Sequence, residues 1–275
     1  MAPPRVLDWK DINSDTIVYE SAKQNKHNGM TVPVKYKDNK DGTLHPIVIQ
    51  TPVMSLPFGV SDKVLEQYGR KIEASLSFPG YAPTGEGDDV VPNWDSEEMR
   101  AFYDWVSMWD ELNPAVVAKN SQTFFRKQIS DVVVRELYKT NIKPSSQPQK
   151  YSPTVRCKVP VASDKPTTDF YNVESKGPVP IDMNRVRTGS RVIALLKTTG
   201  LWFAGKSFGM NFHVVQMVQL ASDKFEGCAI SVPPSLVPVD STPQTKRPIA
   251  FDPGTPPRPD DTASQNPPKR VCVGA

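Results

Sequence analysis

Residues 187–220 have the sequence RTGSRVIALLKTTGLWFAGKSFGMNFHVVQMVQL, and this stretch decides the fold. Val192–Leu196 and Phe212–Val218 are apolar runs of strand length that are rich in β-branched residues. Three glycines punctuate the segment between them: Gly200, Gly205 and Gly209. The pattern predicts two central strands joined by a short connection.

Gly200–Ser207, GLWFAGKS, also satisfies the phosphate-loop pattern G-x-x-x-x-G-K-[ST]. A phosphate loop wraps its backbone N–H groups around an anion and then opens a helix. Leu201–Phe203 are bulky where that wrap needs small residues, and the following FGMNFHVVQMV is typical of a strand. We therefore interpret the segment as an aromatic hairpin, whose rings either pack in the core or stack on bases at the mouth of a β-barrel.

The histidines, which are the usual candidates for catalysis and metal binding, form no recognisable active-site pattern. His27, His45 and His213 are scattered without metal-ligand spacing or a nucleophile beside them, and His213 lies within an apolar strand. We expect no catalytic activity, no metal and no cofactor.

Composition bounds the class of protein. The 275 residues suffice for one large or two small domains, and the formal net charge is +3. No run approaches the roughly 18 apolar residues of a membrane span, and MAPPRVLDWKD lacks a signal-peptide core. Three widely spaced cysteines fit a reducing compartment. We expect an intracellular protein that is not secreted.

The small net charge hides an asymmetry along the chain. Residues 85–113 carry nine acids and one base, Arg100. Residues 143–215 carry eleven bases and four acids. A basic surface is the usual footprint of a polyanion partner. The acidic segment is either a partner surface or a solvated helix face.

Hydrophobic periodicity places the elements. Strands are predicted at residues 16–20, 30–37, 46–51, 71–78 and 153–160. An amphipathic helix capped by Asp95 and Glu98 is predicted next, followed by a second helix at about 119–138 that buries Phe125, Ile129, Val132, Val133 and Leu137. We expect a nucleic-acid-binding β-domain over residues 1–230 with a helical insertion at about 94–140, and a disordered Pro-rich tail over 231–275.

Basic and aromatic residues recur along the predicted strands. In 153–160, Arg156 and Lys158 share one face, and Val155, Cys157 and Val159 share the other. Such a face is either an ordinary solvated face or part of a groove for single-stranded nucleic acid. In such a groove, basic side chains neutralise phosphates and aromatic side chains stack on unpaired nucleobases. The candidate nucleic-acid-binding residues are Lys35, Lys37, Lys150, Tyr151, Arg156, Lys158, Arg185, Arg187, Arg191, Lys197, Trp202, Phe203, Lys206 and Phe208.

Several short motifs carry a resemblance. They are IQTP (49–52), LPFG (56–59), YSPTVRCK (151–158), GLWF (200–203), KSFG (206–209) and VVQ (214–216). Because these motifs occur in this order and spacing, the chain resembles the OB-fold single-stranded DNA-binding proteins of large nucleo-cytoplasmic DNA viruses. The resemblance implies a mainly β, OB-fold-like Greek-key barrel with a two-helix insertion.

The resemblance also implies roles. Arg156 and Lys158 would contact phosphate, Tyr151, Trp202 and Phe203 would stack or shape the groove, and Lys206 would supply charge at the turn. A viral origin would place the protein in the host nucleus or at a cytoplasmic replication site. Related proteins often end in an acidic tail that recruits partners, whereas this tail is mixed in charge and ends KRVCVGA.

The sequence thus predicts a sequence-tolerant single-stranded DNA-binding protein acting in DNA replication, recombination or repair, with replication proteins as further partners. Two alternatives remain open. The β-domain of a virion structural or assembly protein would use the basic face for protein contacts, and an RNA-binding module would read the 2′-hydroxyl.

Overall fold

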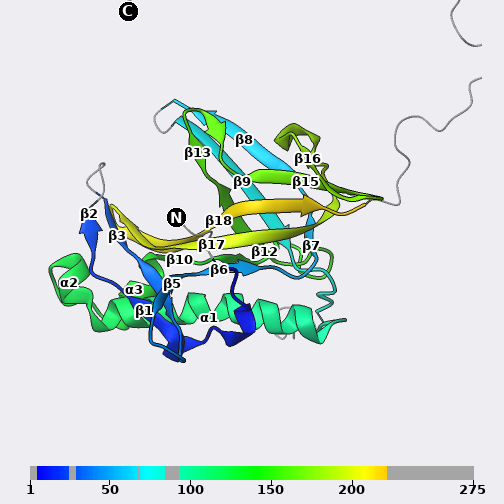
Figure 1. The fold of residues 1–275 in the computed structure, drawn as a ribbon. Helices are drawn as coiled ribbons and strands as arrows, with labels where there is room; N and C mark the ends of the chain where they lie inside the picture. Colours follow the sequence, from blue (N-terminus) through cyan, green and yellow to red (C-terminus); the bar gives the residue numbers. More distant parts are fainter. Residues whose placement is uncertain (1–4, 25–28, 67–68, 84–92, 222–275) are drawn as a thin grey trace, which may run out of the picture. The chain divides into compact units, whose positions relative to one another are not determined.

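The stretch quoted above forms a long hairpin of β17 (Ser190–Ala204) and β18 (Ser207–Gln219). The two central strands are confirmed, but both extend beyond the predicted runs, and Trp202 and Phe203 lie in β17. Gly205 and Lys206 make the turn, and Gly205 has φ +58°, as a two-residue hairpin turn requires. The computed structural model in Figure 1 describes residues 5–24, 29–66, 69–83 and 93–221.

Three further strands close this hairpin into a barrel. They are β7 (Met54–Leu56), β9 (Gly69–Ser77) and β12 (Thr154–Val159). Around the ring, β17 pairs with β7, β7 with β9, β9 with β12, β12 with β18, and β18 with β17. Only the β12–β18 pair is parallel. The ring order is therefore first, second, third, fifth and fourth along the chain, which is the Greek-key order of an OB fold.

The predicted fold class is confirmed: the described chain is mainly β, with helices inserted between β9 and β12. Period-two burial explains the barrel wall. Ile72, Ala74 and Leu76 of β9 are buried, and Val155, Cys157 and Val159, which lie opposite them on the adjacent strand β12, are buried as predicted.

Shorter strands extend this framework. They are β1 (Ile17–Tyr19), β2 (Lys23–Gln24), β3 (Met30–Val32), β4 (Val34–Lys37), β5 (Leu44–Pro46), β6 (Val48–Gln50), β8 (Val60–Leu65), β10 (Tyr138–Lys139), β11 (Ile142–Lys143), β13 (Val161–Ala162), β14 (Lys165–Pro166), β15 (Asp169–Glu174) and β16 (Gly177–Ile181). The predicted strand at 30–37 is interrupted at Pro33, and β1, β4 and β5 form a separate small sheet. Short 3₁₀ turns cover Trp9–Asp11, Ser14–Thr16 and Met183–Arg185.

A bulge at Gly200 lets β17 change partners. Before it, β17 pairs with β6 through Leu195–Lys197, and after it with β3 through Leu201–Phe203. The register against β18 shifts between Thr198 and Leu201. Gly200 has φ +87°, and a Cβ there would lie 2.1 Å from the carbonyl oxygen of Val32. Only glycine fits this approach of β3.

Helix α1 (Glu97–Lys119) covers one side of the barrel (Figure 1). The predicted cap is wrong: Ser96, not Asp95, is the N-cap, and its hydroxyl accepts a hydrogen bond from the Met99 N–H at 3.4 Å. The predicted amphipathic character is confirmed, since Met99, Phe102, Val106 and Trp109, at spacings of three and four, are all buried. Trp105 joins them and contacts Phe212 of β18, with ring centroids 6.1 Å apart.

The second predicted helix is two short helices, α2 (Ser121–Phe125) and α3 (Asp131–Leu137). Arg126 adopts the left-handed conformation, with φ 58°, and ends α2. The restart at Asp131 changes the phase of the helix, so Val134 is buried while Val132 and Val133 are 67% and 40% exposed. The predicted burial of Val132 and Val133 is therefore wrong.

Two observations concern the limits of the fold. None of the helices in the described ranges combines the length and the hydropathy that a membrane crossing requires. The predicted tail, 231–275, lies outside the described residues.

Candidate nucleic-acid interface

A groove of about 280 Å³ lies on the outward face of β9, β12, β17 and β18. Its floor comes from the outward residues of these strands, and its wall comes from the segment that joins β10 to β11. The lining residues are Lys71, Glu73, Lys139, Thr140, Asn141, Lys143, Arg156, Lys158, Trp202, Met210 and Asn211. The second and third barrel strands are the face on which OB folds bind oligonucleotides.

Positive charge dominates this groove. Five of the lining residues are basic and one, Glu73, is acidic. Lys71 pairs with Glu73 at 3.1 Å. In the part of the chain that the structure describes, no carboxylate forms an ion pair with the other four bases: Lys139, Lys143, Arg156 and Lys158. These bases are available to a polyanion.

Burial and mutual repulsion act on two of these lysines. Burial lowers the pKa of Lys143 below its usual value, and the neighbouring Arg156 lowers it further. Burial likewise lowers the pKa of Lys158, against the opposing effect of Glu73. An anion in the groove would relieve this penalty, because a negative charge close by favours the protonated amine.

Trp202 supplies the aromatic surface. A Cβ on Gly209, its partner across the hairpin, would lie 2.9 Å from Cζ2 of the indole, so the ring packs directly on the Gly209 backbone. With its amide oriented to satisfy its neighbours, Asn211 accepts hydrogen bonds from Nε1 of Trp202 at 3.0 Å and from Nζ of Lys158 at 3.2 Å. One side chain therefore orients both the indole and a groove lysine.

The groove wall depends on Asp110 of α1. Its carboxylate accepts hydrogen bonds from the backbone N–H of Asn141 at 2.8 Å, from that of Ile142 at 3.0 Å and from the Tyr138 hydroxyl at 2.9 Å. β10 pairs with β18 at Phe208 and Gly209, and β11 pairs with β12 at Thr154 and Val155. Asp110 thereby fixes the turn that presents Lys139 and Lys143.

The structure brings some of the predicted site residues together. Arg156, Lys158 and Trp202 all line the groove. Lys35 and Lys197 line a neighbouring hollow of about 300 Å³.

Other predicted residues lie outside both hollows. Lys37 is at the end of β4, Lys150 and Tyr151 are in the turn before β12, and Lys206 is at the hairpin tip. Arg185, Arg187 and Arg191 lie toward the opposite end of β17 from Trp202. Tyr151 is 54% exposed, with Nζ of Lys150 5.1 Å from its ring centroid.

Phe203 and Phe208 require a correction. They are 8% and 0% exposed and stack on each other inside the hairpin, with ring centroids 5.3 Å apart. Phe124 and Phe125 of α2 also pack on Phe203, with ring centroids 5.1 and 5.8 Å away. Neither phenylalanine has a free face for a base, so both are core residues.

Sequence reasoning missed several lining residues: Lys71, Glu73, Lys139, Thr140, Asn141, Lys143, Met210 and Asn211. Lys71 and Glu73 carried a signal, because they alternate with the buried residues of β9. Lys139 and Lys143 carried none, since their position depends on pairing with distant strands.

His213 lies beside the groove on β18, between Lys158 of β12 and Lys197 of β17. Burial, and then the two lysines, lower its pKa from 6.5 to about 4. His213 lies within an apolar strand, as the sequence indicates, but its side chain is half-buried and lines two surface hollows.

This pKa predicts a pH effect on stability. Below pH 6.5 the unfolded chain protonates His213, whereas the folded chain does so only near pH 4. The free energy of unfolding should therefore fall as the pH drops through this window. Between pH 7.5 and 4, we expect the native chain to lose about 2 kcal/mol more than His213→Gln, as measured by urea denaturation. Equal losses in the two proteins would contradict this assignment.

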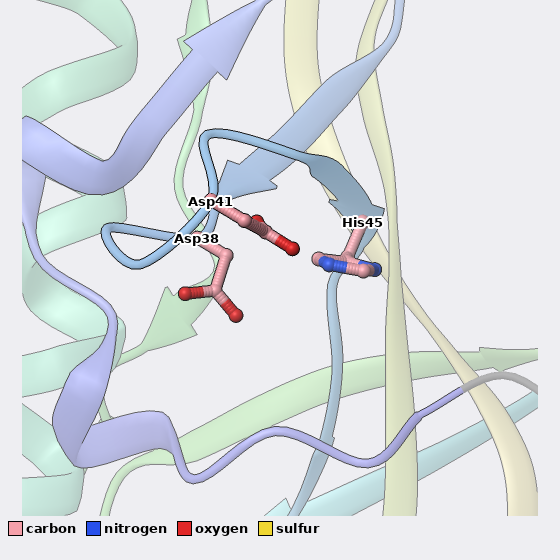
Figure 2. A group of neighbouring side chains, drawn as sticks. All are labelled: Asp38, Asp41 and His45. Carbon is pink, nitrogen blue, oxygen red and sulfur yellow. The ribbon is translucent and has the colours of Figure 1, made fainter.

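A second cluster, Asp38, Asp41 and His45, lies at the turn between β4 and β5 (Figure 2), with its potential ligand atoms within 4.8 Å of one another. These groups already have partners. Asp38 accepts from the backbone N–H of Lys40 and from Arg5, and Asp41 accepts from the N–H and hydroxyl of Thr43. The Thr43 hydroxyl also lies 2.7 Å from Nε2 of His45. The cluster stabilises a turn.

The phosphate-loop pattern has a different context from that of nucleotide hydrolases. Gly200–Ser207 spans the end of β17, the turn and the start of β18. No helix follows it, so its backbone N–H groups do not form a helix N-terminus facing an anion.

Fold and site together define a class: an OB-fold barrel with a basic groove that contains one aromatic ring. The sequence of residues 98–227 matches the model of a family of unknown function (DUF5871). No curated protein matches the chain.

Two solved structures of phage proteins align with this chain at low identity. gp2.5, a single-stranded DNA-binding protein encoded by bacteriophage T7, aligns with a TM-score of 0.39 and 10% identity over 67% of this chain and 91% of its own. The single-stranded DNA-binding protein of bacteriophage Enc34 aligns with a TM-score of 0.38 and 15% identity over 78% of this chain and 96% of its own.

Proposed function

We propose that this chain is a sequence-tolerant single-stranded DNA-binding protein that acts in DNA replication, recombination or repair. The observation that carries the proposal is the groove: four basic residues that form no ion pair with any carboxylate in the described part of the chain line it together with the indole of Trp202. Lysine and arginine neutralise phosphates, and an indole stacks on any base, so this combination binds single strands without reading their sequence.

Each part of the groove has a distinct role in this proposal. Arg156 is exposed and Lys158 is half-buried, and they lie on one face of β12, where they can follow a phosphate backbone. Trp202 offers a ring whose position is fixed by Gly209 and Asn211. A fixed ring loses little conformational entropy when a base stacks on it.

The same proposal includes replication proteins as partners, an intracellular location and no catalytic activity. Membership in the single-stranded DNA-binding family of large DNA viruses also stays a prediction, as does a host nuclear or cytoplasmic site of action.

The test is a fluorescence-anisotropy titration of the full chain with labelled oligo-dT, a duplex of equal length and oligo-rU, at two salt concentrations. We expect oligo-dT to bind about 100-fold more tightly than the duplex, with an affinity that falls steeply as salt rises. Equal weak binding to oligo-dT and duplex would reject the proposal and favour a structural protein. A preference for oligo-rU would favour an RNA-binding module.

A further inference from the structure

Two further hollows continue from the groove: the first shares lining residues with the groove, and the second shares a lining residue with the first. One, of about 600 Å³, shares Lys71 and Lys158 with the groove and has an apolar lining of Leu65, Ile72, Val159, Pro160 and Val161. The other is the hollow of about 300 Å³ that contains Lys35 and Lys197. His213 lines both. The three hollows therefore follow one another across the barrel.

Strand register explains this continuity. Lys158 lies directly beside His213, and His213 directly beside Lys197, on the adjacent strands β12, β18 and β17. Neighbouring strands are about 4.8 Å apart, so the two lysines flank the imidazole across about 10 Å. β4 then adds Lys35 on the far side, beside Lys197.

The side chains of Lys158, His213, Lys197 and Lys35 are chemically suited to contact a nucleotide chain. The half-buried imidazole has lysines on both sides, and no residue lining the hollow of Lys35 and Lys197 is acidic. Among the described residues, neither lysine forms an ion pair with a carboxylate. The larger hollow provides apolar surface for a base, while the lysines provide charge for the phosphates beside it.

We propose that a bound single strand continues from the groove over His213 into a second subsite, where Lys197 and Lys35 contact its phosphates. This proposal rests on the function proposed above and adds a path. The strand crosses β9, β12, β18 and β17 in turn, and only a strand long enough to pass His213 reaches the second pair of lysines.

The test compares two lengths of oligo-dT, of about 4 and about 16 nucleotides, which bracket the site sizes of OB folds. The full chain is titrated by competition as the native protein and as Lys35→Ala/Lys197→Ala. The control is Lys40→Ala/Lys176→Ala, which removes the same charge from two exposed turns without touching the groove or either hollow.

We expect Lys35→Ala/Lys197→Ala to bind the long oligonucleotide about 10-fold more weakly and the short one within a factor of two of the native protein. The salt slope for the long oligonucleotide should fall by about 1.4, since each lost phosphate contact removes about 0.7. The control should match the native protein with both lengths.

If Lys35→Ala/Lys197→Ala weakened binding equally at both lengths, or at neither, the second subsite would be overturned. The proposed function would still stand in that case, provided that the native protein binds oligo-dT. Failure of the native protein to bind either length would overturn both proposals.

Discussion

Replacing Arg156 and Lys158 together with alanine is expected to weaken binding of oligo-dT by about 100-fold or more at low salt. Each side chain lines the groove without a carboxylate partner among the described residues, and a hydrogen bond to a charged group contributes about 1.5 kcal/mol or somewhat more. The loss should be similar for all sequences, because phosphate contacts read none.

The salt dependence of this variant provides the sharper measurement. The slope of log affinity against log salt should fall by about 1.4 for the two lost phosphate contacts. The matched control is Lys119→Ala/Lys176→Ala, which removes two exposed lysines outside the groove and should leave both affinity and slope unchanged. An unchanged slope in Arg156→Ala/Lys158→Ala would place these residues outside the phosphate path.

Replacing Trp202 with alanine is expected to lower the affinity about 5- to 100-fold while leaving the salt slope unchanged. Stacking of one base on an aromatic ring contributes about 1–3 kcal/mol and releases no counterion. Trp202→Phe keeps a ring on Gly209 but loses the hydrogen bond to Asn211, so it should retain most of the affinity.

Thermal unfolding of the same variants separates stacking from packing. Trp202 is half-buried, so we expect its replacement by alanine to lower the melting temperature by a few degrees as well. If the melting temperature fell while the affinity stayed constant, Trp202 would be a core residue and the stacking role would be rejected.

The bulge at Gly200 explains where sequence reasoning succeeded and where it failed. Alternation placed the outward face of β12 correctly, because that strand is regular between Thr154 and Val159. In β17, Lys197 and Thr199 point outward, and an unbroken strand would place Leu201 and Phe203 outward as well. The extra residue reverses the faces, so Trp202 points outward and Phe203 inward.

The groove wall illustrates a second limit. The segment with Lys139 and Lys143 was expected near the end of a helix, and its own sequence contains no sign that it bridges two barrel strands. Its position is set by Asp110, about 30 residues earlier, and by pairing with β18, about 70 residues later. Local propensity carries no information about contacts of this range.

The attachment of Asp110 to this wall also bears on how the protein can be trimmed or redesigned. An insertion between two barrel strands is usually the first segment removed to obtain a minimal domain. Here the helices anchor the turn that supplies Lys139 and Lys143, two of the five groove bases. A barrel shortened by this deletion would keep its strand order and lack one wall of the groove, so the barrel and the insertion must be kept together.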